Sequence, residues 1–380
     1  MTMAVTIFWL SLALALYVYA GYPVCLWLLA RTRRRRASAG EYLPTVTLLI
    51  AAYNEERVMA DKIENGLALD YPRELITIVV ASDGSVDRTN EIVEGYAERG
   101  VRLCAISPRG GKASALTKAM ETIEREIVVL SDANTMYDPQ AVRRLVRHFA
   151  DPGVGAVSGD VRLLSDQADF GIGEGLYYRY ERFIQRTESE VHSLIGADGA
   201  MYALRRSAFR PIRPDTVVDD LVIPLEIAKQ GYRILYEPEA IAWEETSASW
   251  RSEFRRRVRV TAGGFQALLH GAGVPGLRQP MLLFSYVSHK LLRWTLPVIL
   301  LLLAASSLAL LDRPFYRIVA ALQGAFYLCA VAGWVLSKRG WFRSAMVPFY
   351  FCLINVAALV GMAKGLLGRQ SARWEIARNA

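Results

Sequence analysis

The chain has 380 residues, which leaves room for one large globular domain with membrane segments but excludes several independent domains. Hydrophobic residues make up 53% of the chain and collect at its two ends, which is unusual for a soluble enzyme, and the formal net charge is +8. The four cysteines and four histidines are widely scattered, which excludes a disulfide framework and argues against a zinc site.

Residues 4–30 are almost uncharged and exceed the roughly 20 residues that a helix needs to cross a bilayer. We interpret them as a transmembrane helix rather than a cleaved signal peptide, because the apolar stretch is long, no basic residue precedes it and no small-residue cleavage site interrupts it. Arginines follow at 31 and 33–36, and the positive-inside rule places them on the cytoplasmic face. Residues 1–36 are therefore predicted to form a membrane helix and its basic stop. Because topology and anionic lipid explain this basic run, we expect no nucleic-acid partner.

From Thr45 onward, short β-branched runs alternate with amphipathic helical stretches, which is typical of a parallel sheet with crossover helices. The predicted strands are 46–51, 76–81, 101–106, 127–130 and 154–157, and the predicted helices include 87–99, which stops at Gly100, and 112–125. The fold class is therefore α/β, with a Rossmann-like cytoplasmic domain over residues 43–250. Beyond Ser158 the alternation weakens, and we expect a more helical, arginine-rich half that binds the acceptor.

The C-terminal part is predicted to hold an amphipathic interface region over 251–280, transmembrane segments over 281–368 and a basic tail over 369–380. The segments of membrane-compatible length are 291–311, 315–336 and 345–367. If all three cross, the basic tail lies outside, against the positive-inside rule. That leaves open a re-entrant or interfacial segment.

Polar residues follow three of the predicted strands, where ligands bind in parallel α/β sheets. The clusters are 53–56, 82–85 and 131–134. Asp83 can accept a hydrogen bond from a base or ribose, or it can form an Asx turn. Asp132 and Asn134 are two residues apart, where two oxygen ligands can hold a divalent cation against a diphosphate, although a turn explains them equally well.

Three further groups can contribute charge to the same site. Gly110-Gly111-Lys112 opens a helix and can contact a phosphate, but it lacks the P-loop spacing, so an ATPase interpretation is weak. Asp219 and Asp220 precede an amphipathic helix, where one can deprotonate an acceptor hydroxyl or both can favour the helix dipole. Arg256, Arg257 and Arg259 can bind a diphosphate or lipid headgroups.

In order and spacing, these clusters resemble the membrane-integrated family 2 glycosyltransferases, which include cellulose, chitin, hyaluronan and poly-N-acetylglucosamine synthases. The resemblance covers about Leu43 to Leu269 and implies a GT-A-type nucleotide-sugar domain with flanking transmembrane helices. It implies that the uridine is held by Ala52, Tyr53, Asn54, Glu55 and Asp83. It also implies that Lys112 approaches the diphosphate and that Asp132 begins the Asp-X-Asp motif for Mg²⁺ or Mn²⁺, with Asn134 at the second acid position.

The remaining motifs of the family also have counterparts in this chain. The Thr-Glu-Asp motif looks like Val218-Asp219-Asp220, which implies that Asp220 is the catalytic base and Asp219 a supporting acid. The stretch around Asp198 and Gly199 resembles the segment that cradles the acceptor. The Gln-Arg-X-Arg-Trp-X-X-Gly signature aligns with residues 256–263, so that Arg256 and Arg259 are implied at the nucleotide sugar and Val260 replaces the Trp.

We therefore predict an integral membrane enzyme of the bacterial inner membrane, with a cytoplasmic catalytic domain, that transfers a sugar from a UDP-sugar to a polysaccharide or oligosaccharide with inversion. Three alternatives stay open: single transfer to a lipid acceptor, a nucleotidyltransferase that makes the activated sugar, and a nucleotide-binding membrane scaffold. The oligomeric state, the sugar and the linkage are not defined by the sequence.

Overall fold

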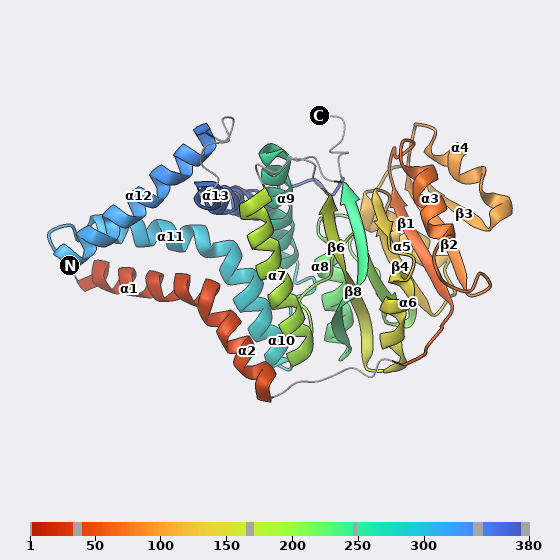
Figure 1. The fold of residues 1–380 in the computed structure, drawn as a ribbon, viewed down its shortest axis with the longest axis horizontal. Coiled ribbons are helices and arrows are strands. Elements are labelled where there is room, and N and C mark those ends of the chain that lie inside the picture. The colour runs from red at the N-terminus through yellow and green to blue at the C-terminus, as the bar shows by residue number, and fades with distance from the viewer. Residues whose placement is uncertain (1, 33–39, 165–170, 246–248, 337–344, 374–380) are drawn as a thin grey trace.

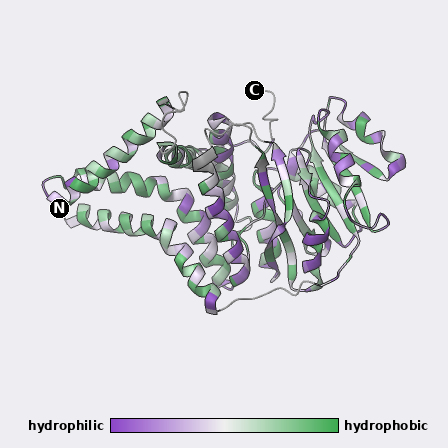
Figure 2. Ribbon diagram, in the orientation of Figure 1, coloured by the Kyte–Doolittle hydropathy of each residue, from purple (hydrophilic) through white to green (hydrophobic). Residues whose placement is uncertain are grey.

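The computed structural model describes residues 2–32, 40–164, 171–245, 249–336 and 345–373. An α/β domain forms one end of the molecule and long helices form the other, with α7 (Gly171–Val191), α9 (Trp250–Leu269) and α10 (Pro280–Ser285) between them (Figure 1). The long helices are mainly hydrophobic along their length (Figure 2). The arginines at 33–36 and the tail beyond Arg373 lie outside the described residues.

The described residues form one eight-stranded sheet with the order β3-β2-β1-β4-β7-β6-β8-β5. The strands are β1 (Val46–Ala52), β2 (Ile76–Asp83), β3 (Val101–Ile106), β4 (Ile127–Asp132), β5 (Thr135–Tyr137), β6 (Val154–Leu164), β7 (Met201–Arg205) and β8 (Arg233–Glu245). The first four pair in parallel, as predicted, whereas β7 runs antiparallel to β4 and β6 and β5 runs antiparallel to β8. The sheet is therefore mixed.

Helices cover both faces of this sheet, which explains why β1 is buried along its whole length. They are α3 (Met59–Leu67), α4 (Thr89–Glu94), α5 (Lys112–Glu121), α6 (Ala141–Val146) and α8 (Asp219–Lys229). The helix predicted over 87–99 is shorter: α4 is followed by a 3-10 turn that ends at Gly100 with φ of 84°. This left-handed residue is the predicted helix stop.

The expectation of a more helical second half agrees with the helices α7, α8 and α9, but β6, β7 and β8 also continue the sheet through this half. Two irregularities in the pairing of β6 with β8, between Val154 and Ala156 and between Ser158 and Asp160, break the two-residue periodicity that predicts strands. Buried polar residues such as Asp160 and Glu237 hide the pattern further. The strand signal is therefore weak in β6 and β8, which carry these buried polar side chains.

Four helical stretches in the described residues are long and apolar enough, by length and composition, to cross a membrane: Thr2–Thr32, Pro280–Leu308, Pro314–Val335 and Met346–Leu366. The first contains α1 (Thr2–Leu16) and α2 (Tyr22–Thr32), and the second contains α10 and α11 (Leu292–Leu308). The last two are α12 (Pro314–Leu336) and α13 (Met346–Leu366). The second stretch begins earlier than the predicted start at 291, because a π-helical turn over Tyr286–Leu291 joins α10 to α11.

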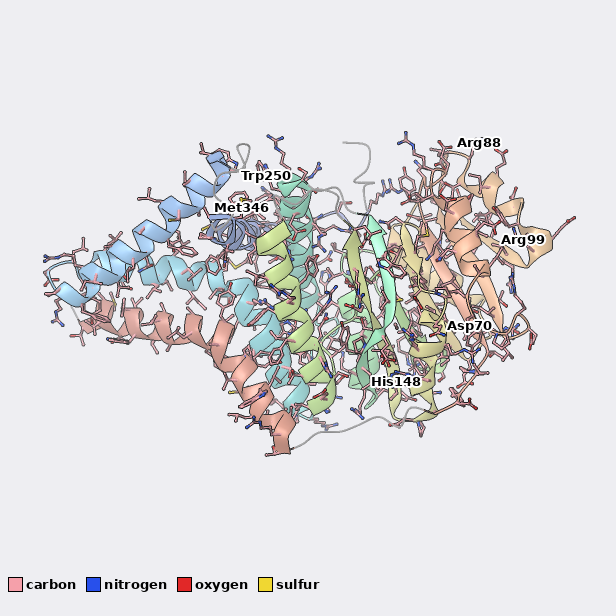
Figure 3. All side chains as sticks on the ribbon, in the orientation of Figure 1. Asp70, Arg88, Arg99, His148, Trp250 and Met346 are labelled. Carbon is pink, nitrogen blue, oxygen red and sulfur yellow. The ribbon has the colours of Figure 1, made fainter. Side chains whose placement is uncertain are left out.

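Helix α13 packs closely along α9; Figure 3 labels their first residues, Met346 and Trp250. Glycines make this approach possible. A Cβ atom added to Gly361 would lie 2.7 Å from the Val258 carbonyl oxygen, and one added to Gly365 would lie 2.6 Å from the Ala262 carbonyl oxygen. The contact therefore joins a candidate membrane span directly to the helix that borders the α/β domain.

We predict that Gly361→Leu separates α13 from α9 and lowers the melting temperature of the detergent-solubilised protein, because overpacking a close contact costs about 1–3 kcal/mol. The matched control is Gly324→Leu in α12, where an added Cβ has no neighbour within 4 Å. Thermal unfolding of both variants is the measurement. Equal melting temperatures for the two variants would contradict the packing.

Candidate active site

The carboxyl ends of β2, β1 and β4 lie next to one another, so the predicted polar clusters meet at one edge of the sheet. Ala52 pairs with Ser82, and Ala51 pairs with Asp132. The turn at Tyr53, Asp83 and Asp132 therefore follow adjacent strands. Arg88 and Arg99 lie at the end of the domain farthest from the long helices (Figure 3), and the Arg88 N–H donates to Glu56 Oε2 of the first cluster at 3.1 Å.

Asp83 is fully buried and holds the loop that leads into α5. Its Oδ1 accepts from the Gly110 N–H at 2.7 Å, and its Oδ2 accepts from the Gly111 N–H at 2.8 Å. The Arg109 Nε lies 3.7 Å from Oδ2. The carboxylate thus fixes the position at which Lys112 begins the helix.

The 53–55 turn packs against the loop after β2. The Arg109 guanidinium stacks 3.4 Å from the centre of the Tyr53 ring. Asn54, with φ of 53°, accepts from the Val86 N–H at 2.9 Å, and the Glu55 N–H donates to Thr89 Oγ1 at 2.8 Å. Together with Asp83 these residues form one wall of polar and aromatic groups, and Ala52 is buried behind it.

Lys112 lies between Asp132 at the end of β4 and Asp219 at the start of α8. Its Nζ lies 2.6 Å from Asp132 Oδ1 and 3.6 Å from Asp219 Oδ2. Burial alone would lower the pKa of Lys112, but the two carboxylates outweigh it and the pKa is raised. Lys112 therefore stays a cation between the two acidic clusters.

Asp220 lies in the first turn of α8, directly after Asp219. Burial and the charge of Asp219 raise the pKa of Asp220 to about 6, while Lys112, Lys290 and Arg259 oppose this rise. Such a carboxylate is ionised at neutral pH and still a better base than an exposed one. Lys290 had not been predicted, because it comes from a candidate span without any local motif.

The loop that carries Asp198 and Gly199 lies against Asp220. A Cβ atom added to Gly199 would lie 3.1 Å from Asp220 Oδ2, so a side chain at this position would crowd the carboxylate. The Asp198 N–H donates to Ser158 Oγ at 2.9 Å. Burial, then the charge of Glu244, raises the pKa of Asp198 to about 7. The predicted acceptor segment and the predicted base are therefore neighbours.

A cavity of about 230 Å³ lies between the α/β domain and the long helices. Its wall includes Asp198, Arg256, Val260 and Lys290 together with the rings of Tyr177, Tyr178 and Tyr236. Arg256 donates to Glu253 Oε2 at 2.8 Å and to the Tyr178 hydroxyl at 2.5 Å. Arg256 therefore lines this cavity, whereas Arg259 acts on Asp220.

The predicted metal ligands are only partly preorganised. Asp132 is paired with Lys112, and Asn134 Nδ2 donates to Glu244 Oε1 at 3.0 Å. Among the described residues, no group of three or more His, Cys, Asp or Glu side chains is close enough to hold an ion. The oxygen atoms of Asp132 and Asn134 nevertheless suit a hard cation such as Mg²⁺ or Mn²⁺, whose remaining ligands come from phosphate and water.

The described part of the C-terminal tail also reaches this region. A Cβ atom added to Gly111 would lie 3.1 Å from the Ala372 carbonyl oxygen, so the tail crosses the start of α5. Residues 370–374 also read Gln-X-X-Arg-Trp, the family signature to which residues 256–263 align. Trp374 lies outside the described residues.

Comparison with known proteins identifies the class of this domain. The solved mannosyltransferase PcManGT from Pyrobaculum calidifontis, in complex with GDP-Man and Mn²⁺, superposes with a TM-score of 0.73 at 22% identity, over 96% of this chain and 100% of that one. The fold is thus the predicted GT-A glycosyltransferase fold. Residues 44–263 match the family described as Glycosyltransferase like family 2, and the chain belongs to that family.

Curated relatives are poly-β-1,6-N-acetyl-D-glucosamine synthases. The protein of Staphylococcus aureus (strain COL) is 28% identical over 233 residues, which are 60% of this chain and 56% of that protein. The Staphylococcus epidermidis protein is 26% identical over 230 residues, 59% of this chain and 55% of that protein. The match therefore spans little more than half the length of these relatives. It confirms the resemblance to this group of synthases.

We predict that Asp83→Asn loosens the loop before α5, because an amide oxygen can replace only one of the two carboxylate acceptors and leaves one N–H unsatisfied, at a cost of about 1–3 kcal/mol. Hydrogen–deuterium exchange should speed up at Gly110 and Gly111. Asp61→Asn, an exposed acid in the first turn of α3, is the control. Unchanged exchange in Asp83→Asn would show that the two hydrogen bonds do not hold the loop.

Proposed function

We propose that this protein is a membrane-bound inverting glycosyltransferase that transfers a sugar from a UDP-sugar to a growing polysaccharide. The observation that carries the proposal is the position of Lys112, whose Nζ lies near Asp132 on the predicted donor side and near Asp219 beside the predicted base. A nucleotide diphosphate beside Lys112 would bring its sugar between these two acidic clusters.

In the proposed reaction, Asp220 accepts the proton of an acceptor hydroxyl while that oxygen attacks the anomeric carbon of the donor. The bond from that carbon to the diphosphate oxygen breaks, and UDP leaves with its bonding electrons, so that an α-linked donor gives a β-linkage. Lys112 and Arg259 stabilise the negative charge on the leaving diphosphate. A divalent cation, which Asp132 and Asn134 would hold, supplies Lewis-acid stabilisation of the same charge.

The cavity supports a glycan acceptor. Val260 stands where the family signature has Trp, but Tyr177, Tyr178 and Tyr236 line the same cavity. Aromatic faces pack well on the apolar faces of sugar rings, and the tyrosine hydroxyls also hydrogen-bond. The names of the curated relatives, which are polysaccharide synthases, agree with this acceptor.

The four candidate spans support a membrane location, and the arginines after the first span support a cytoplasmic catalytic domain in a bacterial inner membrane. In this arrangement α7 and α9 lie between the catalytic domain and the candidate spans (Figure 1). The acceptor cavity then lies near the lipid surface, where a glycan or a lipid-linked acceptor has access.

A second candidate function is single transfer to a lipid-linked acceptor. It is favoured by the lining of the cavity, which includes Lys290, Arg293 and Trp294 of a candidate membrane span. Product length distinguishes the two functions: purified protein with UDP-sugars, beginning with UDP-N-acetylglucosamine, yields a ladder of oligomers in one case and a single addition in the other. Release of UDP in the presence of membranes excludes a non-catalytic scaffold.

We predict that Asp220→Asn reduces kcat by about 10²- to 10⁴-fold, because an amide cannot take the proton of the acceptor hydroxyl. Asp215→Asn, which removes an acid paired with Arg213 on the surface, is the control and should retain activity. UDP release and sugar incorporation are measured together. Near-normal transfer by folded Asp220→Asn would remove the base assignment.

The pH dependence follows from the pKa of Asp220. Only the ionised carboxylate is a base, so kcat/KM should rise with pH through about pH 6 and fall below it. Asp219→Asn removes the neighbouring negative charge, which lowers the pKa of Asp220 and should move the acid limb to lower pH. An acid limb that stays in place in this variant would contradict the coupling of the two acids.

A further inference from the structure

The second acid of the Asp-X-Asp motif is missing from this chain, but another acid lies beside its position. Asn134 is in the turn between β4 and β5, and its Nδ2 donates to Glu244 Oε1 at 3.0 Å. Glu244 is one residue from the end of β8, 110 positions further along the chain. The amide of Asn134 thus holds the carboxylate of Glu244 next to the position at which the Asp-X-Asp motif has its second carboxylate.

Backbone pairing, in addition to the side-chain hydrogen bond, holds Glu244 next to the turn that carries Asn134. Thr135 pairs with Glu244 in the antiparallel ladder between β5 and β8. Lys62, which is fully buried, donates from its Nζ to the Thr135 carbonyl oxygen and lies 4.0 Å from the centre of the Tyr137 ring. The turn that carries Asp132 and Asn134 is therefore held both by β8 and from within the core.

The side chain of Glu244 is held by Asn134, two residues after Asp132. Asp132 and Asp198 lie near enough for their charges to act on Glu244, and Lys112 and Arg256 oppose them. Asn134 uses its Nδ2 on Glu244, which leaves its Oδ1 as an oxygen donor. Two carboxylates and an amide oxygen are the donor set that Mg²⁺ or Mn²⁺ shares with a diphosphate.

We propose that Glu244 supplies the second carboxylate of the divalent cation site, together with Asp132, and that Asn134 orients it. This inference rests on the proposed transfer from a nucleotide sugar, because the same cation would contact the donor diphosphate. The acid missing at position 134 is thereby replaced by one from β8.

The test of this proposal exchanges the carboxylate at position 244 and the amide at position 134. Mn²⁺ binding to the full-length protein in detergent, with UDP present, is titrated by electron paramagnetic resonance. Glu244→Gln should weaken binding by at least about tenfold, in line with the loss of a ligand-site contact. Adding Asn134→Asp to Glu244→Gln restores one carboxylate and allows the same hydrogen bond in the opposite direction, so the double variant should bind within about threefold of the native protein.

Glu239→Gln is the matched control, because Glu239 is an exposed acid on the same strand that pairs with Arg147. It should bind Mn²⁺ like the native protein, and thermal unfolding checks that all variants are folded. Native affinity in Glu244→Gln overturns the proposal. A loss that Asn134→Asp does not restore also overturns it, because Glu244 would then support only the turn.

The result of the Mn²⁺ titration can be distinguished from the result of the sugar-transfer assay. If the native protein transfers sugar but Glu244→Gln binds Mn²⁺ normally, the function stands and the ligand assignment fails. If no nucleotide sugar is used but the exchange pattern of Mn²⁺ affinity holds, the ligand assignment stands and the transferase function fails.

Discussion

The active-site region depends on one buried cation. Asp132 ends β4 and Asp219 begins α8, and two carboxylates from such distant parts of the chain would repel each other without Lys112 between them. The place of Lys112 is set in turn by Asp83, which binds the two N–H groups immediately before it. Asp83, at the end of β2, therefore fixes the position of the positively charged Lys112.

The long helices fix the other side of the same site. A Cβ atom added to Gly263 of α9 would lie 2.8 Å from Val218, the residue before Asp219, so α9 packs directly under the start of α8. Through Gly361, α9 is in turn held by α13. The carboxylates at the start of α8 are thus positioned by helices that include a candidate membrane span, which makes the α/β domain and the apolar helices parts of one site.

The first half of the α/β domain was predictable from sequence because its signals are local. Buried parallel strands give apolar runs, and the residues just after them, such as Asp83 and Asp132, lie at a known edge of the sheet. Only the first residues of β6, 154–157, were predicted, and β8 was missed, because bulges and buried acids break the periodicity of these strands. Lys290 and Glu244 were missed for another reason: each reaches the site only through tertiary packing, which no short motif encodes.

Asn134 and Val260 differ from the family motifs to which they align, and at both positions a neighbouring element supplies the missing kind of group. At each position the expected chemical group is absent from the motif but present in the surrounding wall: a carboxylate on β8 beside Asn134, and tyrosine rings on α7 and β8 around the cavity that Val260 lines. A bound ion or sugar responds to the groups that reach it, whichever element carries them. The chemistry of this site therefore depends on all the residues that the sheet and helices bring together. A position-by-position comparison with a motif does not count the groups that come from other elements.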